Sequence, residues 1–413
     1  MHPRDISILD FTYHLPQERI ALYPLAERDA SQLLVYKSGY IQKDHYSNLA
    51  EHLPPQSLLV FNNTKVIRAR INFKKPTGGV IEIFCLEPFE TINDYSFVMN
   101  MTGTSSWKCM IGGAGKWKTG DLEKTILIND DHIILRASLV SKLPDAFVVS
   151  FSWTPSHYSF AEILEMAGDI PLPPYMKREP DAGDSNRYQT IYAIHEGSVA
   201  SPTAGLHFTD SLFQKLDAKG CSKDFVTLHV GAGTFKPVKA ERMEAHTMHA
   251  EWIEVSTQVV ENIISHLDNL IIAVGTTSAR TMESLYWMGV KTLLDPELEE
   301  LRLGQWEVYD PPMNLTGIAP KYALTSLLYW LKRKKQSTLF TTTQLIIAPG
   351  YQFMIAGALV TNFHQPNSTL LLLVAAAVGK DWKTIYDYAL ENDFRFLSYG
   401  DGSLLFINND LIA

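Results

Sequence analysis

The chain has 413 residues, of which 46% are hydrophobic and 20% are charged, and its formal net charge is −9. This composition excludes a disordered or collagen-like chain, and the length is sufficient for two or three domains. The cysteines, Cys85, Cys109 and Cys221, are too few and too far apart for a disulfide scaffold or a zinc site built from cysteines. We therefore expect a cytoplasmic protein.

The longest apolar run, residues 370–378, falls well short of the roughly 20 residues that span a bilayer. The first residues, MHPRDIS, contain no apolar signal core. We therefore expect no membrane association. The acidic net charge argues against indiscriminate binding to nucleic acids, although it leaves room for one local basic face.

The first 70 residues combine turns with short apolar runs. Residues 32–36 and 57–61 are typical of buried strands, and residues 44–54 predict a short helix that ends at the two prolines 54 and 55. From about residue 71 to residue 154 the pattern changes to six short β-branched or alternating runs, separated by turn residues at hairpin spacing. Six such strands predict a small barrel or sandwich.

We interpret residues 71–154 as an inserted all-β domain that interrupts a main domain formed by residues 1–70 and 155–413. In the second part, helical and strand patterns alternate, which predicts an α/β domain with helices packed on a mixed sheet. Residues 225–230 and 271–275 are expected strands, and residues 211–220 and 279–289 are expected helices that stop at glycine. The less regular stretch 291–342 contains an expected helix at 320–335.

The densest polar stretch is 186–208. Gly197 and Gly205, with small neighbours, allow the backbone to approach a ligand closely, and Thr203 and His207 supply polar groups. A tight loop between core elements explains the stretch equally well. In the next motif a strand runs into GAGT (231–234), where exposed amides can meet a polar ligand. Lys236 stands where a dinucleotide fingerprint needs its third glycine.

His246, His249 and Glu251 lie close together in the sequence, after His207 and His229 in the two preceding motifs. Three such ligands and a water form a catalytic zinc site, so a metal-dependent hydrolase is one alternative. The helical H-E-x-x-H motif is absent, and the following WIEV run favours a strand. Acid–base or hydrogen-bonding histidines therefore fit this region better than metal ligands.

Residues 273–284 predict a strand, a Gly-Thr-Thr-Ser turn and a helix, which is where open α/β sheets usually bind ligands. Arg280 and Glu283 lie one turn apart on that helix and are expected either to pair or to face a ligand. His364 and Asp401 lie in turn-rich segments near the end of the chain and are explained as turn residues.

These segments together carry a resemblance to a known family. The chain resembles the S-adenosylmethionine:tRNA ribosyltransferase-isomerase family of the queuosine pathway, through motifs that span nearly its whole length. The blocks GSVASPTAGLHFT (197–209) and TLHVGAGTF (227–235) are long and specific, and other matching segments include VGTTSARTMES (274–284) and TNFHQPNSTLLLLV (361–374).

The resemblance implies an α/β main domain with an inserted six-stranded β-barrel. It also implies a reaction in which the ribosyl part of S-adenosylmethionine moves onto 7-aminomethyl-7-deazaguanine in tRNA. The product is epoxyqueuosine, and adenine and methionine leave. S-adenosylmethionine would then be a co-substrate, tRNA the partner, and the enzyme a monomer without a bound prosthetic group or metal.

The implied mechanism needs a base near a sulfonium, an acid for departing adenine, and exclusion of water. We expect the catalytic residues around one pocket, with Arg280 holding a carboxylate or phosphate. They are His207, His229, His249, Glu251 and Arg280. The residues expected to shape the site for S-adenosylmethionine are Thr203, Gly231, Gly233 and Thr234.

Some positions depart from the family's usual motifs. They are Gln32 for Arg, Arg68 for Pro, Gly357 for Asp, Gln365 for Leu and Gly402 for Ala. They leave open a paralogue with an altered or lost RNA substrate. For tRNA, we expect one basic face formed by residues 65–75 and 177–187.

Overall fold

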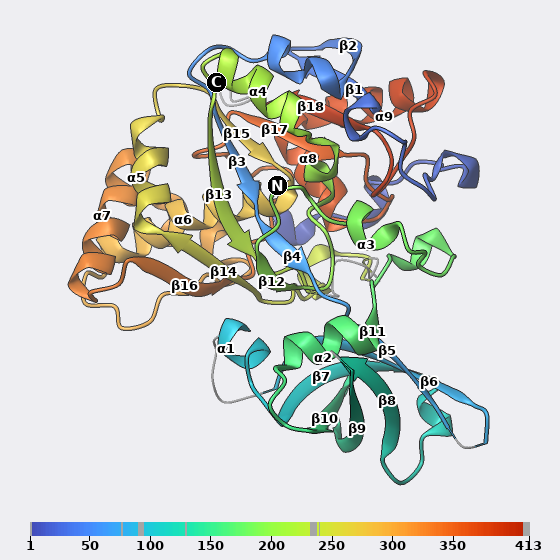
Figure 1. Ribbon diagram of the computed structural model, residues 1–413. Coiled ribbons are helices and arrows are strands. Elements are labelled where there is room, and N and C mark those ends of the chain that lie inside the picture. The colour runs from blue at the N-terminus through green and yellow to red at the C-terminus, as the bar shows by residue number, and fades with distance from the viewer. Residues whose placement is uncertain are drawn as a thin grey trace.

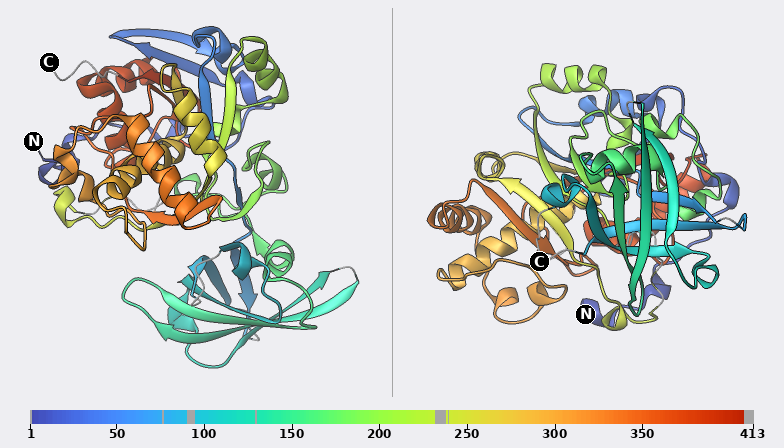
Figure 2. Two further views of the ribbon diagram at one scale, coloured as in Figure 1. Left: turned by 90° about the vertical axis from the view of Figure 1, so that its left-hand side faces the viewer. Right: turned by 60° about the horizontal axis from the view of Figure 1, so that its bottom comes forward.

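The computed structural model describes residues 2–75, 77–89, 95–128, 130–231, 238 and 240–407, which form two units of different architecture (Figure 1). The larger unit is a sheet covered by helices, and the smaller unit is a curled sheet joined to one end of it (Figure 2). No helix among the described residues is long and apolar enough to cross a membrane.

The sheet of the larger unit has nine strands in the order β16-β14-β13-β3-β15-β17-β18-β1-β2. Strands β13, β3, β15 and β17 are parallel neighbours, whereas β14, β16 and β2 pair in antiparallel fashion, so the predicted mixed sheet is confirmed. The strands are β1 (Gln32–Lys37), β2 (Tyr40–His45), β3 (Leu58–Asn62), β13 (Ser222–Leu228), β14 (Glu251–Ser256), β15 (Ile271–Val274), β16 (Thr338–Thr343), β17 (Ala358–Asn362) and β18 (Gly402–Phe406).

Helices cover both faces of this sheet, because successive side chains of a strand point to opposite faces. In β3, Leu58 and Val60 face one core, and Leu59 and Phe61 face the other. A 3-10 helix, Tyr46–His52, and α4 contribute to the second core, and the other helices of the larger unit contribute to the first. The helices are α4 (Asp210–Ala218), α5 (Thr257–Ser265), α6 (Thr276–Leu294), α7 (Pro320–Arg333), α8 (Thr369–Val378) and α9 (Trp382–Glu391).

One helix boundary predicted from glycine is wrong. Helix α6 does not stop at Gly289 but continues to Leu294. A Cβ at position 289 would overlap the backbone of Ala323 in α7, so the glycine allows the two helices to pack closely. Helix α4, in contrast, does end before Gly220, which adopts a positive φ of 79°.

The smaller unit is an antiparallel sheet in the order β11-β5-β6-β7-β10-β9-β8. Six of its strands lie within residues 70–154, and β11 joins from outside this range. One of the six runs expected to be strands, residues 95–101, begins instead as the short helix α1. The sheet is curled, and β5 lies near β8, but no ladder joins these two strands in the described residues, so a closed six-stranded barrel is not confirmed. The strands are β5 (Arg70–Lys74), β6 (Val80–Pro88), β7 (Thr104–Gly112), β8 (Leu122–Ile128), β9 (Asp131–Lys142), β10 (Phe147–Thr154) and β11 (Gly168–Asp169).

A core of its own stabilises the smaller unit. Phe73, Trp107, Ile133 and Phe151 are fully buried in this core, and Phe160 of α2 (Phe160–Ala167) closes it. Two further short elements of the smaller unit and the junction are α1 (Tyr95–Met99) and α3 (Asp184–Arg187). At the junction, β4 (Thr64–Val66) pairs in parallel with β12 (His195–Ser198).

Candidate functional site

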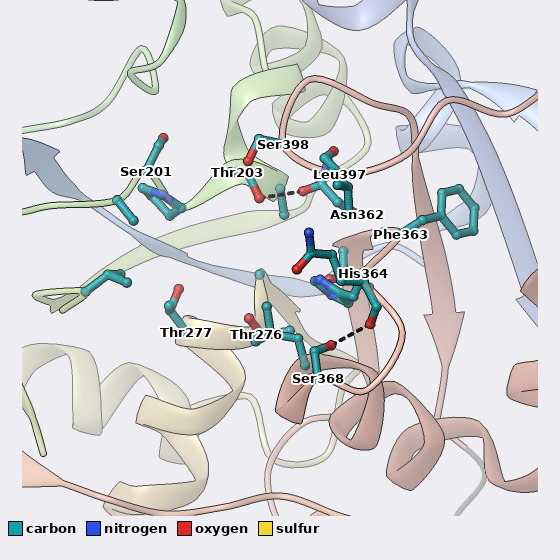
Figure 3. Close-up of a pocket in the computed structure, with 18 of the residues that line it drawn as sticks. Ser201, Thr203, Thr276, Thr277, Asn362, Phe363, His364, Ser368, Leu397 and Ser398 are labelled. Carbon is teal, nitrogen blue, oxygen red and sulfur yellow. Dashed lines mark hydrogen bonds between the residues drawn. The ribbon is translucent and has the colours of Figure 1, made fainter. Parts of the chain in front are cut away.

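A pocket lies where the central parallel strands of the main sheet end (Figure 3). Val230 follows β13, Gly275 follows β15, and Asn362 ends β17, and all three line the pocket. The carboxyl ends of parallel strands meet at one edge of a sheet, and open α/β sheets usually bind ligands there. The strand, turn and helix expected at 273–284 are present as β15, Gly275 and α6.

The start of α6 forms one wall of the pocket. Gly275 has a positive φ of 95° and has no side chain to cap the helix, and Thr276 and Thr277 line the pocket directly after it. The hydroxyl of Thr277 is buried and has no hydrogen-bond partner in the described part of the chain. First-turn amides and a free hydroxyl at this place suit a carboxylate or another anionic group of a ligand.

The opposite wall comes from residues 200–204. Thr203 donates a hydrogen bond of 2.8 Å from Oγ1 to Oδ1 of Asn362, which joins this wall to the end of β17 (Figure 3). Ser201 also lines the pocket, and its buried hydroxyl lacks a partner among the described residues. The pocket therefore contains two buried hydroxyl groups without hydrogen-bond partners among the described residues, on Ser201 and Thr277. A buried hydroxyl without a partner lowers stability, so a ligand or water that bonds to it is favoured.

His364 completes the pocket just after β17. Burial lowers the pKa of its imidazole from 6.5 to about 3, so the ring is neutral at pH 7. Its Nε2 lies 2.8 Å from the hydroxyl of Thr361, and its backbone is bonded by the hydroxyls of Tyr13 and Tyr386. A histidine fixed in this way is a rigid hydrogen-bonding group. The sequence identified His364 only as a turn residue. The neighbouring residues in the sequence do not show that this turn lies beside residues 201–203 and 275–277.

Comparisons with known proteins agree with the resemblance seen in the sequence. The family model described as queuosine biosynthesis protein matches residues 8–405. The chain belongs to this family. An S-adenosylmethionine:tRNA ribosyltransferase-isomerase from Chlorobaculum parvum is 36% identical over 405 residues, which cover 97% of this chain and 100% of the relative.

Two more relatives carry similar names. The enzyme of the same name from Legionella pneumophila is 36% identical over 401 residues, which cover 96% of this chain and 98% of the relative. A solved structure of S-adenosylmethionine tRNA ribosyltransferase from Thermotoga maritima is 28% identical, covers 96% of this chain and 99% of its own, and has a TM-score of 0.45.

Within this family member, the predicted site residues separate into the pocket and its surroundings. Thr203 lines the pocket, and His207 lies behind the pocket wall. Asn362 Nδ2 donates to Nε2 of His207 over 3.2 Å, and the ring of Tyr46 stacks on the imidazole at 4.3 Å. Burial, followed by the charges of Arg395 and Arg28, lowers the pKa of His207 to about 3. Asn362 thus joins Thr203 to a neutral His207.

His229 lies one residue from the pocket-lining Val230, at the junction with the smaller unit. Its Nδ1 is 3.1 Å from the hydroxyl of Thr64, and its ring stacks on Tyr95 of α1 at 4.9 Å. Burial lowers the pKa of His229 to about 4. A Cβ at Gly197 would lie 2.8 Å from Nδ1 of His229 and 2.6 Å from the Tyr95 ring. The glycine therefore makes room for this stacked pair.

Glu251 and Arg280 form a buried ion pair one turn along α6 from Thr277. Burial raises the pKa of Glu251, although the charge of Arg280 and the amide of Gly231, which donates over 3.3 Å, act in the opposite direction. His249 is exposed, and its electrostatic interaction with Glu251 lowers the pKa of that carboxyl group. The predicted residues Gly233 and Thr234 lie outside the described residues.

The pairing proposed between Arg280 and Glu283 is wrong. Arg280 pairs with Glu251, whereas Glu283 points to the other side of α6. There its carboxylate accepts hydrogen bonds from the hydroxyl of Tyr351 and from the amides of residues 354–356. Glu283 thus fixes the chain segment that leads into β17.

The metal-dependent alternative lacks its ligand set in the structure. Among the described residues no three His, Cys, Asp or Glu side chains come together in a way that could hold a metal ion. His249 is exposed, and Glu251 is already paired with Arg280. Family membership favours the transferase interpretation instead.

The two segments expected to form the basic face touch through Arg68 and Ser185. Arg68 donates to the Ser185 hydroxyl over 3.2 Å, and Arg70 donates to the carbonyl of Leu172. Many of the charges are balanced by carboxylates. These ion pairs are Lys65–Glu196, Arg68–Glu165, Arg70–Glu82 and Arg178–Asp184. Paired charges attract RNA phosphates less strongly, so the face is less basic than its composition implies.

The departures from the family motifs lie outside the pocket lining, except Gln365. Gly357 stands at the start of β17, at the opposite end from the pocket residue Asn362. Gln32 donates from Nε2 to Asp401, which also accepts from the Arg395 amide. Asp401 therefore connects the start of β1, through Gln32, to the loop that contains Arg395.

Proposed function

We propose that the protein transfers and isomerises the ribosyl part of S-adenosylmethionine onto 7-aminomethyl-7-deazaguanine in tRNA. The product is epoxyqueuosine in tRNA, and adenine and methionine are released. One observation carries the proposal: three separate motifs of the family resemblance converge on a single pocket. These motifs contribute residues 200–204, 275–277 and 361–368. The near full-length identity of 36% to enzymes named for this reaction supports it.

The pocket offers S-adenosylmethionine two kinds of contact. The first-turn amides of α6 and the hydroxyl of Thr277 suit its carboxylate, because a helix start attracts anions. The hydroxyls of Ser201 and Thr203 and the neutral ring of His364 offer hydrogen bonds to its uncharged polar groups. Gly231 follows β13 as the first residue of the GAGT motif, and we retain Gly231, Gly233 and Thr234 as parts of the proposed site for S-adenosylmethionine.

The reaction requires a proton to leave the ribosyl carbon next to the sulfonium and a proton to reach the departing adenine. His207 and His364 are neutral and buried, which suits hydrogen bonding and positioning better than proton uptake at pH 7. His249 is the exposed histidine beside Glu251, so we assign proton transfer to this pair. Arg280 stabilises the charged form of Glu251 through their ion pair. His229, whose ring stacks on Tyr95 of α1, helps to fix the contact between the two units.

The remaining parts of the proposal concern organisation. We propose that residues 71–154 form an inserted domain with a barrel-like sheet, and that residues 1–70 and 155–413 form the catalytic domain. Separate hydrophobic cores in the two units support this division. We also propose a monomer in the cytoplasm. Three free cysteines are consistent with a reducing compartment.

A single incubation tests the reaction. The protein is mixed with S-adenosylmethionine that is labelled in the ribose and with tRNA that carries the aminomethyl precursor. We expect label in the tRNA together with equal amounts of free adenine and methionine. Binding of tRNA without release of adenine would instead identify a non-catalytic RNA-binding paralogue, and stoichiometric zinc with hydrolytic activity would identify a metal-dependent hydrolase.

A further inference from the structure

A second, smaller hollow adjoins the pocket. Ser398 lines both, and Arg28 and Arg187 line the smaller one together with His207 and Tyr399. Glu27 also lines the smaller hollow, but its carboxylate forms no ion pair with either arginine. Arg187 is the last residue of α3, which lies on the larger unit above its connection to the smaller unit (Figure 1). The hollow therefore borders the pocket in which we place S-adenosylmethionine.

Both arginines are held in place by main-chain carbonyl groups. Arg28 donates from Nη1 to Leu206 over 3.0 Å and from Nη2 to Asn186 over 2.8 Å. Arg187 donates to the carbonyls of Ala26 and Leu25 over 2.9 and 2.7 Å. These contacts fix the two guanidinium groups but leave their charges without a counterion, because a carbonyl oxygen has no net charge.

This arrangement is unusual within the molecule. Every other half-buried arginine in the described ranges pairs with a carboxylate, whereas no described carboxylate lies within ion-pair distance of Arg28 or Arg187. The arginines with carboxylate partners are Arg4, Arg19, Arg68, Arg70, Arg178, Arg280 and Arg395.

The two charges also repel each other. Burial lowers the pKa of Arg28, and the nearby charge of Arg187 lowers it further. The Nε of Arg187 is buried and has no hydrogen-bond partner among the described residues. Like charges that are partly removed from water are costly unless an anion joins them, and the planar guanidinium group is well suited to phosphate oxygens.

We propose that Arg28 and Arg187 bind a backbone phosphate of the RNA substrate, next to the nucleotide that enters the pocket. This inference rests on the proposed function, which requires an RNA base to reach the pocket. A nucleotide in that position has a phosphate on each side, within one nucleotide of the reacting base. The carboxylate of S-adenosylmethionine is the other possible anion, but the start of α6 already offers it a site in the main pocket.

The test uses Arg187→Gln, which removes the charge, and Arg187→Lys, which keeps the charge but not the planar group. Binding of the tRNA anticodon stem-loop is measured over a range of salt concentrations. Loss of one phosphate contact is expected to reduce the salt slope of log Kd by about one and to weaken binding about tenfold. Arg187→Lys should restore the slope. The KM for S-adenosylmethionine should stay unchanged.

Arg333→Gln is the matched control, because Arg333 is an exposed arginine of α7 that is paired with Glu297. It should leave both the slope and the KM values unchanged. Arg28→Gln is the second variant, and thermal unfolding confirms that each variant is folded.

The outcomes separate the inference from the proposed function. If folded Arg187→Gln and Arg28→Gln bind the stem-loop with the wild-type slope, the phosphate site is overturned, even though adenine release would still support the proposed function. If the KM for S-adenosylmethionine rises instead, the site holds its carboxylate, and the RNA assignment is overturned. If the wild-type protein releases no adenine, the proposed function fails, while the salt slopes still decide whether the arginines bind RNA.

Discussion

The hydroxyl group of Tyr46 occupies the space in which a side chain at Gly402 would begin. Tyr46 is fully buried against His207, and a Cβ at position 402 would overlap its hydroxyl and approach the carbonyl oxygen of Thr361. The usual alanine of the family motif therefore does not fit in this chain. The departure at Gly402 is explained by packing in the core behind the pocket and requires no change of RNA substrate.

We therefore expect Gly402→Ala to destabilise the protein by about 1–3 kcal/mol, the usual cost of overpacking a core. Tyr46→Phe in the same chain should recover part of this loss, because it removes the overlapping hydroxyl, while the Thr361 carbonyl remains close. Urea unfolding of the two single variants and the double variant measures the coupling. Gly115→Ala is the control, since a Cβ at Gly115 meets nothing within 4 Å. Equal losses in the single Gly402→Ala variant and the double variant would contradict this explanation.

Thr277→Val should raise the KM for S-adenosylmethionine about tenfold, because it removes the hydroxyl that we assign to the ligand carboxylate. Thr281→Val, one turn later in α6, removes a hydroxyl that bonds to the carbonyl of Thr277 and does not line the pocket. This control should leave the KM near that of the wild type. Steady-state kinetics at saturating tRNA gives both values, and a Thr277→Val enzyme with an unchanged KM would remove the hydroxyl from the site.

The buried histidines predict a loss of stability in mild acid. In the folded chain the pKa values of His207 and His364 are lowered to about 3, and that of His229 to about 4, from 6.5. Between pH 6.5 and these values the unfolded chain binds more protons, so stability is complete above pH 6.5 and falls as the pH decreases. Each histidine contributes a slope of up to about 1.4 kcal/mol per pH unit.

Replacing one of these histidines should reduce that slope. Urea unfolding between pH 7 and pH 4.5 should show a shallower pH dependence for His364→Gln than for the wild type, whatever the variant's stability at pH 7. His14→Gln, at an exposed position, should keep the wild-type slope. An unchanged slope in His364→Gln would mean that this ring is not held neutral by burial.

Glu283→Gln should destabilise the protein by about 2–4 kcal/mol. The carboxylate accepts from three amides and from the Tyr351 hydroxyl, and an amide side chain cannot accept from all of them. Because these bonds fix the segment before β17, the kcat should fall as well. Glu300→Gln is an exposed control in the same unit. Wild-type unfolding and kcat values for Glu283→Gln would show that the network is dispensable.

The sequence predicted local elements better than their partners. The apolar run 57–61 and the strand, turn and helix at 273–284 depend on short-range periodicity, and both are present. Sequence spacing could not show that Asn362 joins Thr203 to His207, or that Arg280 pairs with Glu251 rather than Glu283, because these contacts connect distant parts of the chain.

Gly289 also shows that a contact between distant residues can overrule a local pattern. By itself, glycine in a helical pattern indicates a stop. Here the closeness of Ala323 in α7 gives the glycine a packing role, and this neighbour is invisible from the sequence around position 289. The sequence identified His364 only as a turn residue for a similar reason. Its place in the pocket depends on the ends of β13 and β15, which lie far away in the sequence.

The order of strands in the main sheet has a consequence for how the chain folds. Strand β18, at residues 402–406, lies between β17 and β1, so the strand that is synthesised after all the other described strands fills an interior position of the sheet. Until it emerges from the ribosome, β1 and β2 have no ladder to the rest of the sheet, whereas the smaller unit already has its complete core. Until β18 is made, the nascent chain therefore exposes two open sheet edges, one on β17 and one on β1, which favours aggregation during this interval.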